Sequence, residues 1–161
     1  RQASEAGLET VISTGDKDMA QLVDERVTLV NTMSNAVLDP DGVEQKFGVA
    51  PERIIDYLAL MGDSADNIPG VPKVGPKTAA KWLRQYGSLD ALVAQADQVG
   101  GKVGENLREF LPQLPLSRQL VTIDREVGLD KAPTDLRPSE PDPQALAELF
   151  RELEFKTWLR E

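Results

Sequence analysis

Two pairs of aspartates stand where carboxylates could bind a divalent cation. The first pair, Asp16 and Asp18, follows directly after a short β-rich stretch that ends at Thr14. In open α/β sheets, ligands gather beyond the carboxyl ends of the strands. Two carboxylates at this spacing repel each other unless a cation lies between them. A metal site is one interpretation of the pair. A polar turn is the other, because Asp is a common turn residue.

The second pair, Asp63 and Asp66, follows an apolar segment with helical spacing. Side chains three residues apart can face the same way on a turn. The C-terminal end of a helix is an unfavourable place for two negative charges, so a bound metal would account for them. The alternative is a solvated loop in which one of the two aspartates caps the turn that follows.

Residues 68–88 contain four basic side chains and no acidic one, in a chain whose net charge is −9. These are Lys73, Lys77, Lys81 and Arg84, and the last three fall on one helical face. A glycine-bearing turn that opens a helix presents free N–H groups and the positive end of the helix dipole, which together bind phosphate. We interpret the segment as a site for DNA phosphates. A basic, solvated helix face is the alternative.

The composition narrows the chemistry further. The chain has no Cys and no His, which excludes disulfides, thiolate metal sites, His-ligated zinc and Ser-His-Asp triads. A metal would therefore sit among oxygen ligands, which suits Mg²⁺, Mn²⁺ or Ca²⁺. With 18 basic against 27 acidic residues, any contact with DNA must come from a local basic patch. No apolar run approaches the roughly 20 residues of a membrane span, and we expect a cytoplasmic protein.

A small sheet followed by helices would position these groups. Asp39 is expected to cap one helix and Gly48 to end it, while Ser88 caps another. Trp82, Tyr57 and Trp158 are expected to pack in the core. We expect strands at 8–14, 27–31 and 35–39, a hairpin between the last two, helices at 40–47, 51–61, 78–86, 89–93, 105–111, 116–121 and 145–153, and loops at 100–104 and 130–143. The fold class is α/β, with a partial, parallel-type sheet on the N-terminal side and a mostly helical remainder.

Three motifs follow one another in a specific order and spacing. They are STGDKDMAQL, IIDYLALMGDSADNIPGVPKVGPKTAAKWL and YGSLDAL. Each is a weak signal alone, but together they resemble the flap endonuclease family, in particular the 5′→3′ exonuclease domain of bacterial DNA polymerase I. The resemblance runs from about residue 11 to about residue 158. The tail ELFRELEFKTWLRE resembles the end of the polymerase-linked form of that domain.

This resemblance implies a divalent-metal-dependent 5′→3′ exonuclease and 5′-flap endonuclease that acts on DNA phosphodiesters in replication and repair. It implies that Mg²⁺ or Mn²⁺ is held by four catalytic carboxylates, those of Asp16, Asp18, Asp63 and Asp66. The partners would be duplex DNA with a 5′ flap or 5′ end, and a polymerase module in the same full-length chain. The location would be the bacterial cytoplasm, at the nucleoid.

The resemblance also implies that the segment from Gly70 to Leu83 is a helix–hairpin–helix-like motif that grips duplex DNA. The DNA-binding residues would be Lys73, Gly75, Lys77, Thr78 and Lys81, and the carbonyls of Val71 and Val74 would be candidate ligands for K⁺. The related hairpin usually reads Gly-hydrophobe-Gly, whereas this one reads Lys73-Val74-Gly75. A positive φ at the first position would strain a lysine. Lys73 could instead add a phosphate contact.

We expect residues 1–66 to be the C-terminal part of an α/β nuclease core and residues 67–161 to be a helical DNA-binding region. The N-terminal half of the family's domain, with its remaining acidic ligands and its basic arch, is expected to be missing. The chain would then hold half of an active site. The alternatives are a stand-alone flap endonuclease-like protein, a non-catalytic DNA-binding module built on the hairpin, and a plain acidic α/β scaffold.

Overall fold

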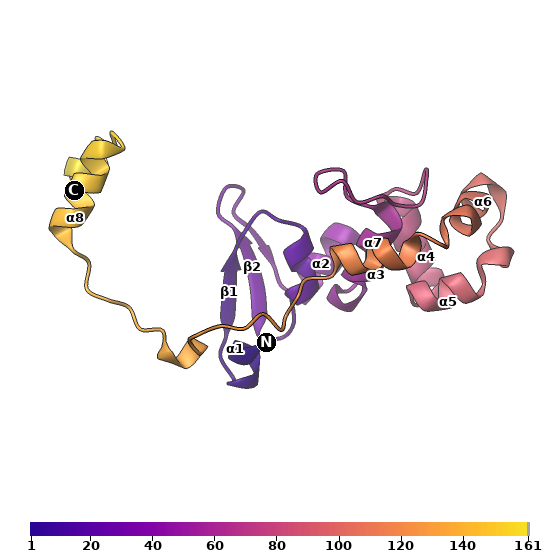
Figure 1. The fold of residues 1–161 in the computed structure, drawn as a ribbon, viewed down its shortest axis with the longest axis horizontal. Helices are drawn as coiled ribbons and strands as arrows, with labels where there is room; N and C mark the ends of the chain where they lie inside the picture. The colour runs from indigo at the N-terminus through magenta and orange to yellow at the C-terminus, as the bar shows by residue number, and fades with distance from the viewer. Residues whose placement is uncertain (161) are drawn as a thin grey trace. The chain divides into compact units, whose positions relative to one another are not determined.

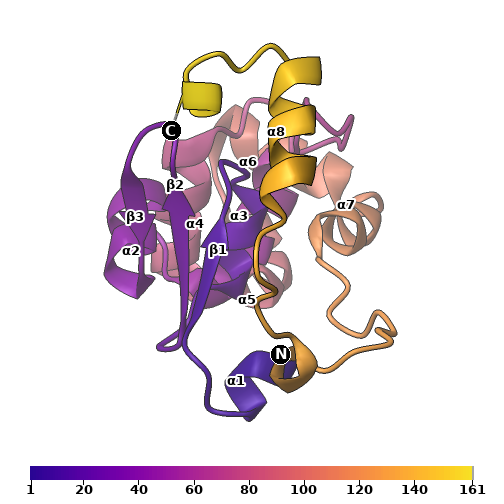
Figure 2. The same ribbon diagram turned by 90° about the vertical axis from the view of Figure 1, so that its left-hand side faces the viewer.

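Three short strands form a sheet near the N-terminus, in the order β1–β2–β3 (Figures 1 and 2). The computed structural model describes residues 1–160. Strand β1 (Thr10–Ser13) runs parallel to β2 (Val27–Asn31), which pairs antiparallel with β3 (Ala36–Leu38). The parallel pair and the hairpin confirm the expected α/β class, and the sheet as a whole is mixed. The first aspartate pair therefore follows the C-terminal end of strand β1.

Helices and short 3₁₀ turns make up most of the remaining elements of the chain. The bounds of the helices and 3₁₀ turns are α1 Gln2–Glu5, η1 Asp18–Leu22, α2 Pro40–Phe47, η2 Pro51–Arg53, α3 Ile54–Met61, α4 Pro76–Tyr86, α5 Leu89–Ala94, η3 Ala96–Gln98, α6 Gly101–Phe110, α7 Leu114–Val121, η4 Pro133–Asp135, α8 Pro143–Glu152 and η5 Trp158–Arg160. Between residues 1 and 128, the strands lie toward one end and α4, α5 and α6 toward the other (Figure 1).

The predicted helix caps are confirmed at α2 and α5. The side chain of Asp39 accepts a hydrogen bond of 2.8 Å from the backbone N–H of Gly42. Gly48 ends α2 with a φ of 75°, in the left-handed region where a residue without Cβ is not strained. Ser88 accepts a hydrogen bond of 3.1 Å from the N–H of Ala91. These short-range bonds satisfy helix N–H groups that have no partner inside the helix.

The expected loop at residues 100–104 is wrong, because helix α6 begins at Gly101. Packing outweighs the low helix propensity of glycine here. An ideal Cβ on Gly104 would lie 1.9 Å from the carbonyl oxygen of Val99, so only glycine allows this close approach. Arg108 then donates hydrogen bonds to the carbonyls of Ala96 and Val99, at 2.8 and 3.1 Å. The preceding turn is thereby fixed against the helix.

Helix α3 is the centre of the core and packs against α4 and α7. Leu58 and Leu60 on this helix are almost fully buried. Trp82 and Tyr57 are buried as expected, and Tyr57 meets Phe47 edge-to-face at 5.9 Å between ring centroids. The apolar stripe of α3 thus fixes the end from which Asp63 and Asp66 emerge.

A buried carboxylate ties α3 to two neighbouring helices. Asp56 is 3% exposed and accepts a hydrogen bond of 3.0 Å from the N–H of Leu89 at the start of α5. The guanidinium of Arg118 on α7 lies 3.1 Å from the same carboxylate. Buried charge is tolerated only when it is paired and hydrogen-bonded, and both conditions are met here. Three helices are therefore joined around one side chain.

Residues 1–128 and the residues from 129 onward form two compact units. The core of the first unit continues across residue 66, because α3 packs against α4 and α7. The expected division at residue 66, between a nuclease core and a DNA-binding region, stays a prediction. In the second unit, Trp158 is 54% exposed and meets Phe155 at 4.9 Å, so its expected core position is wrong. A unit this small has little interior in which to bury an indole.

Two further surface features concern the described residues. Within residues 1–160, no helix combines the length and the apolar character needed to cross a bilayer.

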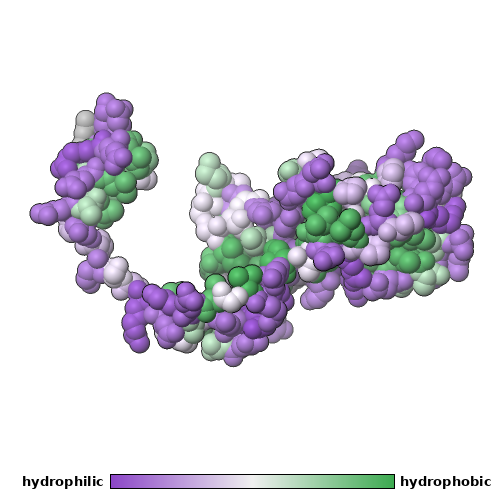
Figure 3. Space-filling view, viewed as in Figure 1, coloured by the Kyte–Doolittle hydropathy of each residue, from purple (hydrophilic) through white to green (hydrophobic). Residues whose placement is uncertain are grey.

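Figure 3 shows an apolar patch over α7, where Leu116 and Leu120 are 57% and 54% exposed.

Candidate metal centre and DNA-binding loop

Two consecutive side-chain turns carry the chain from β1 to Asp18. The hydroxyl oxygen of Thr14 accepts a hydrogen bond of 3.1 Å from the N–H of Asp16. The carboxylate of Asp16 in turn accepts a hydrogen bond of 2.9 Å from the N–H of Asp18. The first is an ST turn and the second an Asx turn, which are ordinary local uses of threonine and aspartate. Asp16 thus shapes the turn, and Asp18 begins η1 with its side chain directed elsewhere.

Gln21 fixes η1 to the end of α7, one hundred residues later in the sequence. Its side-chain amide donates hydrogen bonds of 2.9 Å to the carbonyls of Asp18 and Val121. Its amide oxygen accepts a hydrogen bond of 3.0 Å from the N–H of Ile123. All three bonds hold the first turn of η1, so the position of Asp18 depends on helix α7 as well as on the sheet.

The second aspartate pair lies in a tight loop that follows α3. Gly62 has a φ of 71°, and an ideal Cβ there would lie 2.4 Å from the backbone nitrogen of Gly70. Asp63 and Ile68 then exchange backbone hydrogen bonds of 2.8 and 2.7 Å. The N–H of Ala65 donates to the carboxylate of Asp63 at 2.9 Å. The backbone and one carboxylate oxygen of Asp63 are thereby fixed.

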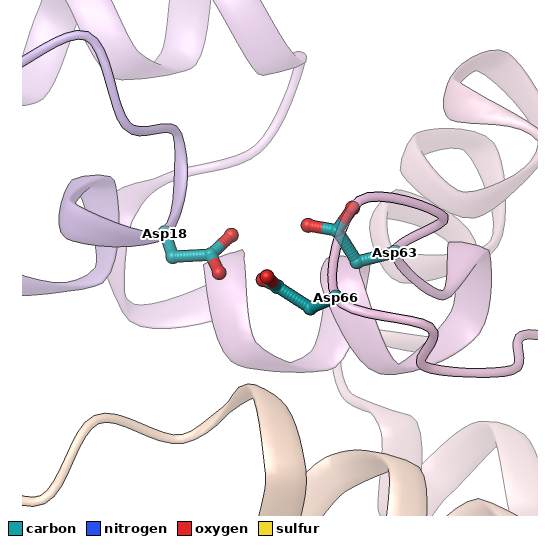
Figure 4. A group of neighbouring side chains, drawn as sticks. All are labelled: Asp18, Asp63 and Asp66. Atoms are coloured by element: carbon teal, nitrogen blue, oxygen red, sulfur yellow. The ribbon is translucent and has the colours of Figure 1, made fainter.

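Three of the four predicted carboxylates come together in space. Asp18 from η1 faces Asp63 and Asp66 from the loop after α3 (Figure 4). One oxygen from each lies within 4.8 Å of the others. Among the described residues, Asp16 is not part of this group. Its side chain is exposed, and its carboxylate accepts the hydrogen bond from the N–H of Asp18. Oxygen ligands alone at this spacing suit a hard divalent cation.

The three carboxylates have unequal surroundings. The Oδ1 atom of Asp18 is buried and has no hydrogen-bond partner. Burial, followed by the negative charges of Asp16 and Asp63, raises the pKa of Asp18. An unpartnered buried oxygen is costly, and a cation bound there would satisfy it. Asp63 is 5% exposed, whereas Asp66 is exposed.

Lys17 is a site residue that sequence reasoning left without a role. Its ammonium donates a hydrogen bond to Oδ2 of Asp63 and forms an ion pair with it. This bond lowers the pKa of Asp63, and it raises the pKa of Lys17. The position of Lys17 between two aspartates was the available signal. The partner 46 residues away could not be read from the motif.

The connection between α3 and α4 contains the segment that the family resemblance implied to be a hairpin, and this segment is called the hairpin below. Lys73 has a φ of 65°, so the strained conformation that the departure from glycine predicted is present. Two buried polar side chains hold this loop from other helices. Asn106 donates to the carbonyl of Pro72 at 2.6 Å, and the hydroxyl of Ser117 donates to the carbonyl of Pro69 at 2.7 Å. Nothing in the local sequence indicated either contact.

Helix α4 separates an apolar face from a basic one. Its buried residues are Ala79, Ala80, Trp82 and Leu83. Lys73, Lys77 and Lys81 are exposed, and no carboxylate among residues 1–160 lies within 4 Å of their ammonium groups. Gly75 is the N-cap of this helix, and Thr78 in its first turn is half-buried. The three ammonium groups are therefore available to an anion.

The candidate carbonyl ligands for K⁺ lie in the same loop. The carbonyl of Val71 accepts a hydrogen bond of 3.0 Å from the N–H of Val74, and the N–H of Val71 donates to Leu60 at 2.9 Å. A carbonyl oxygen has a second lone pair, so this turn leaves Val71 one acceptor position.

Comparison with known proteins identifies the family. The family model described as 5′-3′ exonuclease, C-terminal SAM fold, matches residues 49–144. That range contains the second aspartate pair, the hairpin and helices α3 to α7. The chain belongs to this 5′-3′ exonuclease family.

Relatives of this exonuclease family match the chain nearly from end to end. DNA polymerase I of Pseudomonas aeruginosa is 54% identical over 99% of the chain, which spans 18% of that relative. A 5′-3′ exonuclease of Aquifex aeolicus is 37% identical over 98% of the chain, which spans 54% of it. The bacteriophage T5 flap endonuclease, solved as a pseudo-enzyme–product complex with DNA and metal ions, has a TM-score of 0.69 at 22% identity. That match covers 74% of this chain and 45% of the phage protein, and it shows a shared fold.

Proposed function

We propose that the chain is part of a divalent-metal-dependent 5′ nuclease that hydrolyses DNA phosphodiesters. The observation that carries the proposal is the meeting of Asp18, Asp63 and Asp66 within 4.8 Å, with a buried, unpartnered oxygen on Asp18. These residues would hold Mg²⁺ or Mn²⁺, and Asp16 would add a fourth negative charge beside them. A bound metal supplies an activated water and stabilises the leaving oxygen, which suits a chain without His.

The basic face of α4 would hold the DNA backbone. Phosphate contacts would come from the exposed ammonium groups of Lys73, Lys77 and Lys81 and from the first turn of the helix at Gly75 and Thr78. In this proposal, residues 1–66 would contain the metal centre, and residues from 67 onward would make most of the DNA contacts. The carbonyls of Val71 and Val74 are proposed ligands for K⁺ in the hairpin.

The substrate would be duplex DNA with a 5′ flap or a 5′ end, as in replication and repair. The T5 protein of the same fold was solved with DNA and metal ions, which supports this substrate class. The polymerase I relatives support a polymerase module on the same full-length polypeptide. The proposed site of action is the cytoplasm, at the nucleoid. A stand-alone 5′ nuclease is the second candidate, favoured by the match to 54% of the Aquifex aeolicus exonuclease.

Cleavage of a labelled 5′-flap DNA tests the proposal. The chain is incubated with the flap in Mg²⁺ and, separately, in excess chelator. Cutting that requires Mg²⁺ and is lost in Asp63→Asn supports a complete centre in this chain. Binding without cutting, weakened by salt, indicates that the remaining ligands lie on other parts of the full-length protein. The absence of both cutting and binding would contradict the proposal.

A further inference from the structure

We propose that Lys17 is a positioning residue that occupies Asp63 in the metal-free protein and is displaced when a divalent cation binds. Its ammonium would act as a built-in counter-ion that holds the centre together and lowers its affinity for the metal. This inference rests on the proposed function, because it concerns the same three carboxylates.

Both oxygens of Asp63 have partners in the metal-free structure. Oδ1 accepts the N–H of Ala65, a backbone bond inside the tight loop after α3. Oδ2 accepts the ammonium of Lys17. Each oxygen keeps a lone pair beside its partner, but a cation bound at Oδ2 would lie against the ammonium of Lys17, so the two positive charges compete for Asp63. The backbone bond belongs to a loop that is also closed by the bridge between Asp63 and Ile68, so Lys17 is the partner that can be displaced.

Lys17 can leave without any rearrangement of the backbone. Its side chain is 37% exposed, whereas that of Asp63 is 4% exposed. The four-carbon stem of lysine is flexible, and its ammonium is readily hydrated in solvent. The residue also adjoins Asp18 in the sequence, so a displaced ammonium would remain beside the centre. There it could meet an anionic group of a substrate.

The two inner carboxylates respond differently to a metal as a result. Asp18 has a buried oxygen without a partner, so a cation gains a ligand there at no loss of a hydrogen bond. At Asp63 a cation meets the positive charge of the ion-paired ammonium of Lys17. The ammonium of Lys17 and the metal ion compete for the carboxylate of Asp63. Each of them lowers the affinity of the carboxylate for the other by the same factor. The metal affinity of the chain should therefore increase when Lys17 is removed.

Titration of Mn²⁺ by calorimetry into the 161-residue chain measures this competition. Lys17→Met keeps the length of the stem and removes the charge. Lys102→Met is the matched control, because Lys102 forms an exposed ion pair of 2.8 Å with Glu105 on α6. We expect Lys17→Met to bind Mn²⁺ about five- to tenfold more tightly than the unmodified chain, and Lys102→Met to bind it equally. Equal or weaker binding by Lys17→Met would overturn the proposal.

Displacement itself is visible by NMR of the lysine side chains, with Mg²⁺ as a diamagnetic probe. We expect the ¹⁵Nζ resonance of Lys17 to shift on saturation with Mg²⁺ while that of Lys102 stays in place. A resonance that does not move would overturn displacement, even if the affinity changes through charge alone. Mn²⁺ binding with an unchanged affinity in Lys17→Met removes only the role of Lys17. If no form of the chain binds Mn²⁺, the metal centre of the proposed function fails together with this inference.

Discussion

The carboxylates of the proposed centre differ in burial and in the charges beside them. Asp18 is partly buried beside other acids, Asp63 is buried against a lysine, and Asp66 is exposed. Repulsion among ionised carboxylates is relieved by protonation, by the ammonium of Lys17 or by a bound metal. The same three residues therefore link metal affinity, stability and pH.

The exposed member of the group gives the clearest test of metal binding. Saturating Mn²⁺ should raise the melting temperature of the chain by about 5–10 °C, since ligand at 100 times Kd adds about 2.7 kcal/mol. Asp66→Ala should leave the metal-free melting temperature nearly unchanged and remove most of this increase. Asp97→Ala is the control, because Asp97 is also exposed and lies in η3. An equal increase in both variants, measured by differential scanning calorimetry, would contradict the assignment.

The raised pKa of Asp18 predicts a pH dependence of definite sign. Because the folded pKa lies above the usual 3.8, protonated Asp18 favours the folded state. This stabilisation is fully present below the unfolded pKa and is lost as the pH rises through the folded value. In chelator at pH 7, Asp18→Asn should melt higher than the unmodified chain, with the difference shrinking as the pH falls toward 3. In saturating Mn²⁺ the order should reverse. A lower melting temperature of the variant in chelator at pH 7 would contradict this account.

At the scale of elements, the close contact between the two loop glycines decides the shape of the hairpin. An ideal Cβ on Gly70 would lie 2.1 Å from the carbonyl carbon of Met61 and 2.3 Å from the nitrogen of Gly62. Gly70→Ala should therefore lower the free energy of unfolding by about 3 kcal/mol or more. Gly75→Ala is the matched control in the same loop, because nothing lies within 4 Å of its Cβ position and its φ is −114°. Chemical denaturation measures both, and equal losses would contradict the packing argument.

The basic face of α4 predicts a salt-dependent affinity for duplex DNA. Each lysine that contacts a phosphate adds about 0.9 to the negative slope of log K against log salt. Lys77→Gln and Lys81→Gln should each weaken binding and reduce the slope by about 1. Lys46→Gln on α2 is the control, because Lys46 is exposed and lies outside the basic segment. Fluorescence anisotropy at several salt concentrations measures the slope. A slope reduced equally by the control would contradict a site on α4.

The short-range features of these elements could be predicted from sequence, and the long-range ones could not. The caps at Asp39 and Ser88 are local hydrogen bonds between residues three apart, so their pattern is visible in the chain. The start of α6 at Gly101 depends on a neighbouring turn, which local glycine propensity does not reveal. Likewise, Asn106 and Ser117 hold the hairpin across 34 and 48 residues.

The group of Asp18, Asp63 and Asp66 shows that long-range contacts of the site could not be predicted from the sequence either. The motifs indicated both pairs of aspartates. Only the folded chain shows that Asp18, without Asp16, lies beside Asp63 and Asp66. Lys17 was visible in the motif, and its partner was not. Residue types and spacing thus predicted which chemistry to look for. Tertiary packing decided which side chains meet.

For the whole molecule, the compact units predict where the chain can be shortened. The metal centre, the hairpin and helices α3 to α7 all lie within residues 1–128. A chain ending at Gly128 should melt cooperatively and keep the Mn²⁺-induced increase in melting temperature. A chain ending at Asp66 lacks α4 and α7, which cover α3, and should not fold. Circular dichroism melts compare the two, and loss of cooperativity on truncation at 128 would contradict the assignment of units.

The central claim is that Asp18, Asp63 and Asp66 bind one divalent cation between them. Anomalous diffraction from crystals of the chain grown with Mn²⁺ tests it most directly, because the signal places the metal without reference to activity. The account predicts an anomalous peak enclosed by these three carboxylates, with the ammonium of Lys17 moved away from Asp63. A structure with Mn²⁺ bound elsewhere and the three carboxylates free of metal would contradict it.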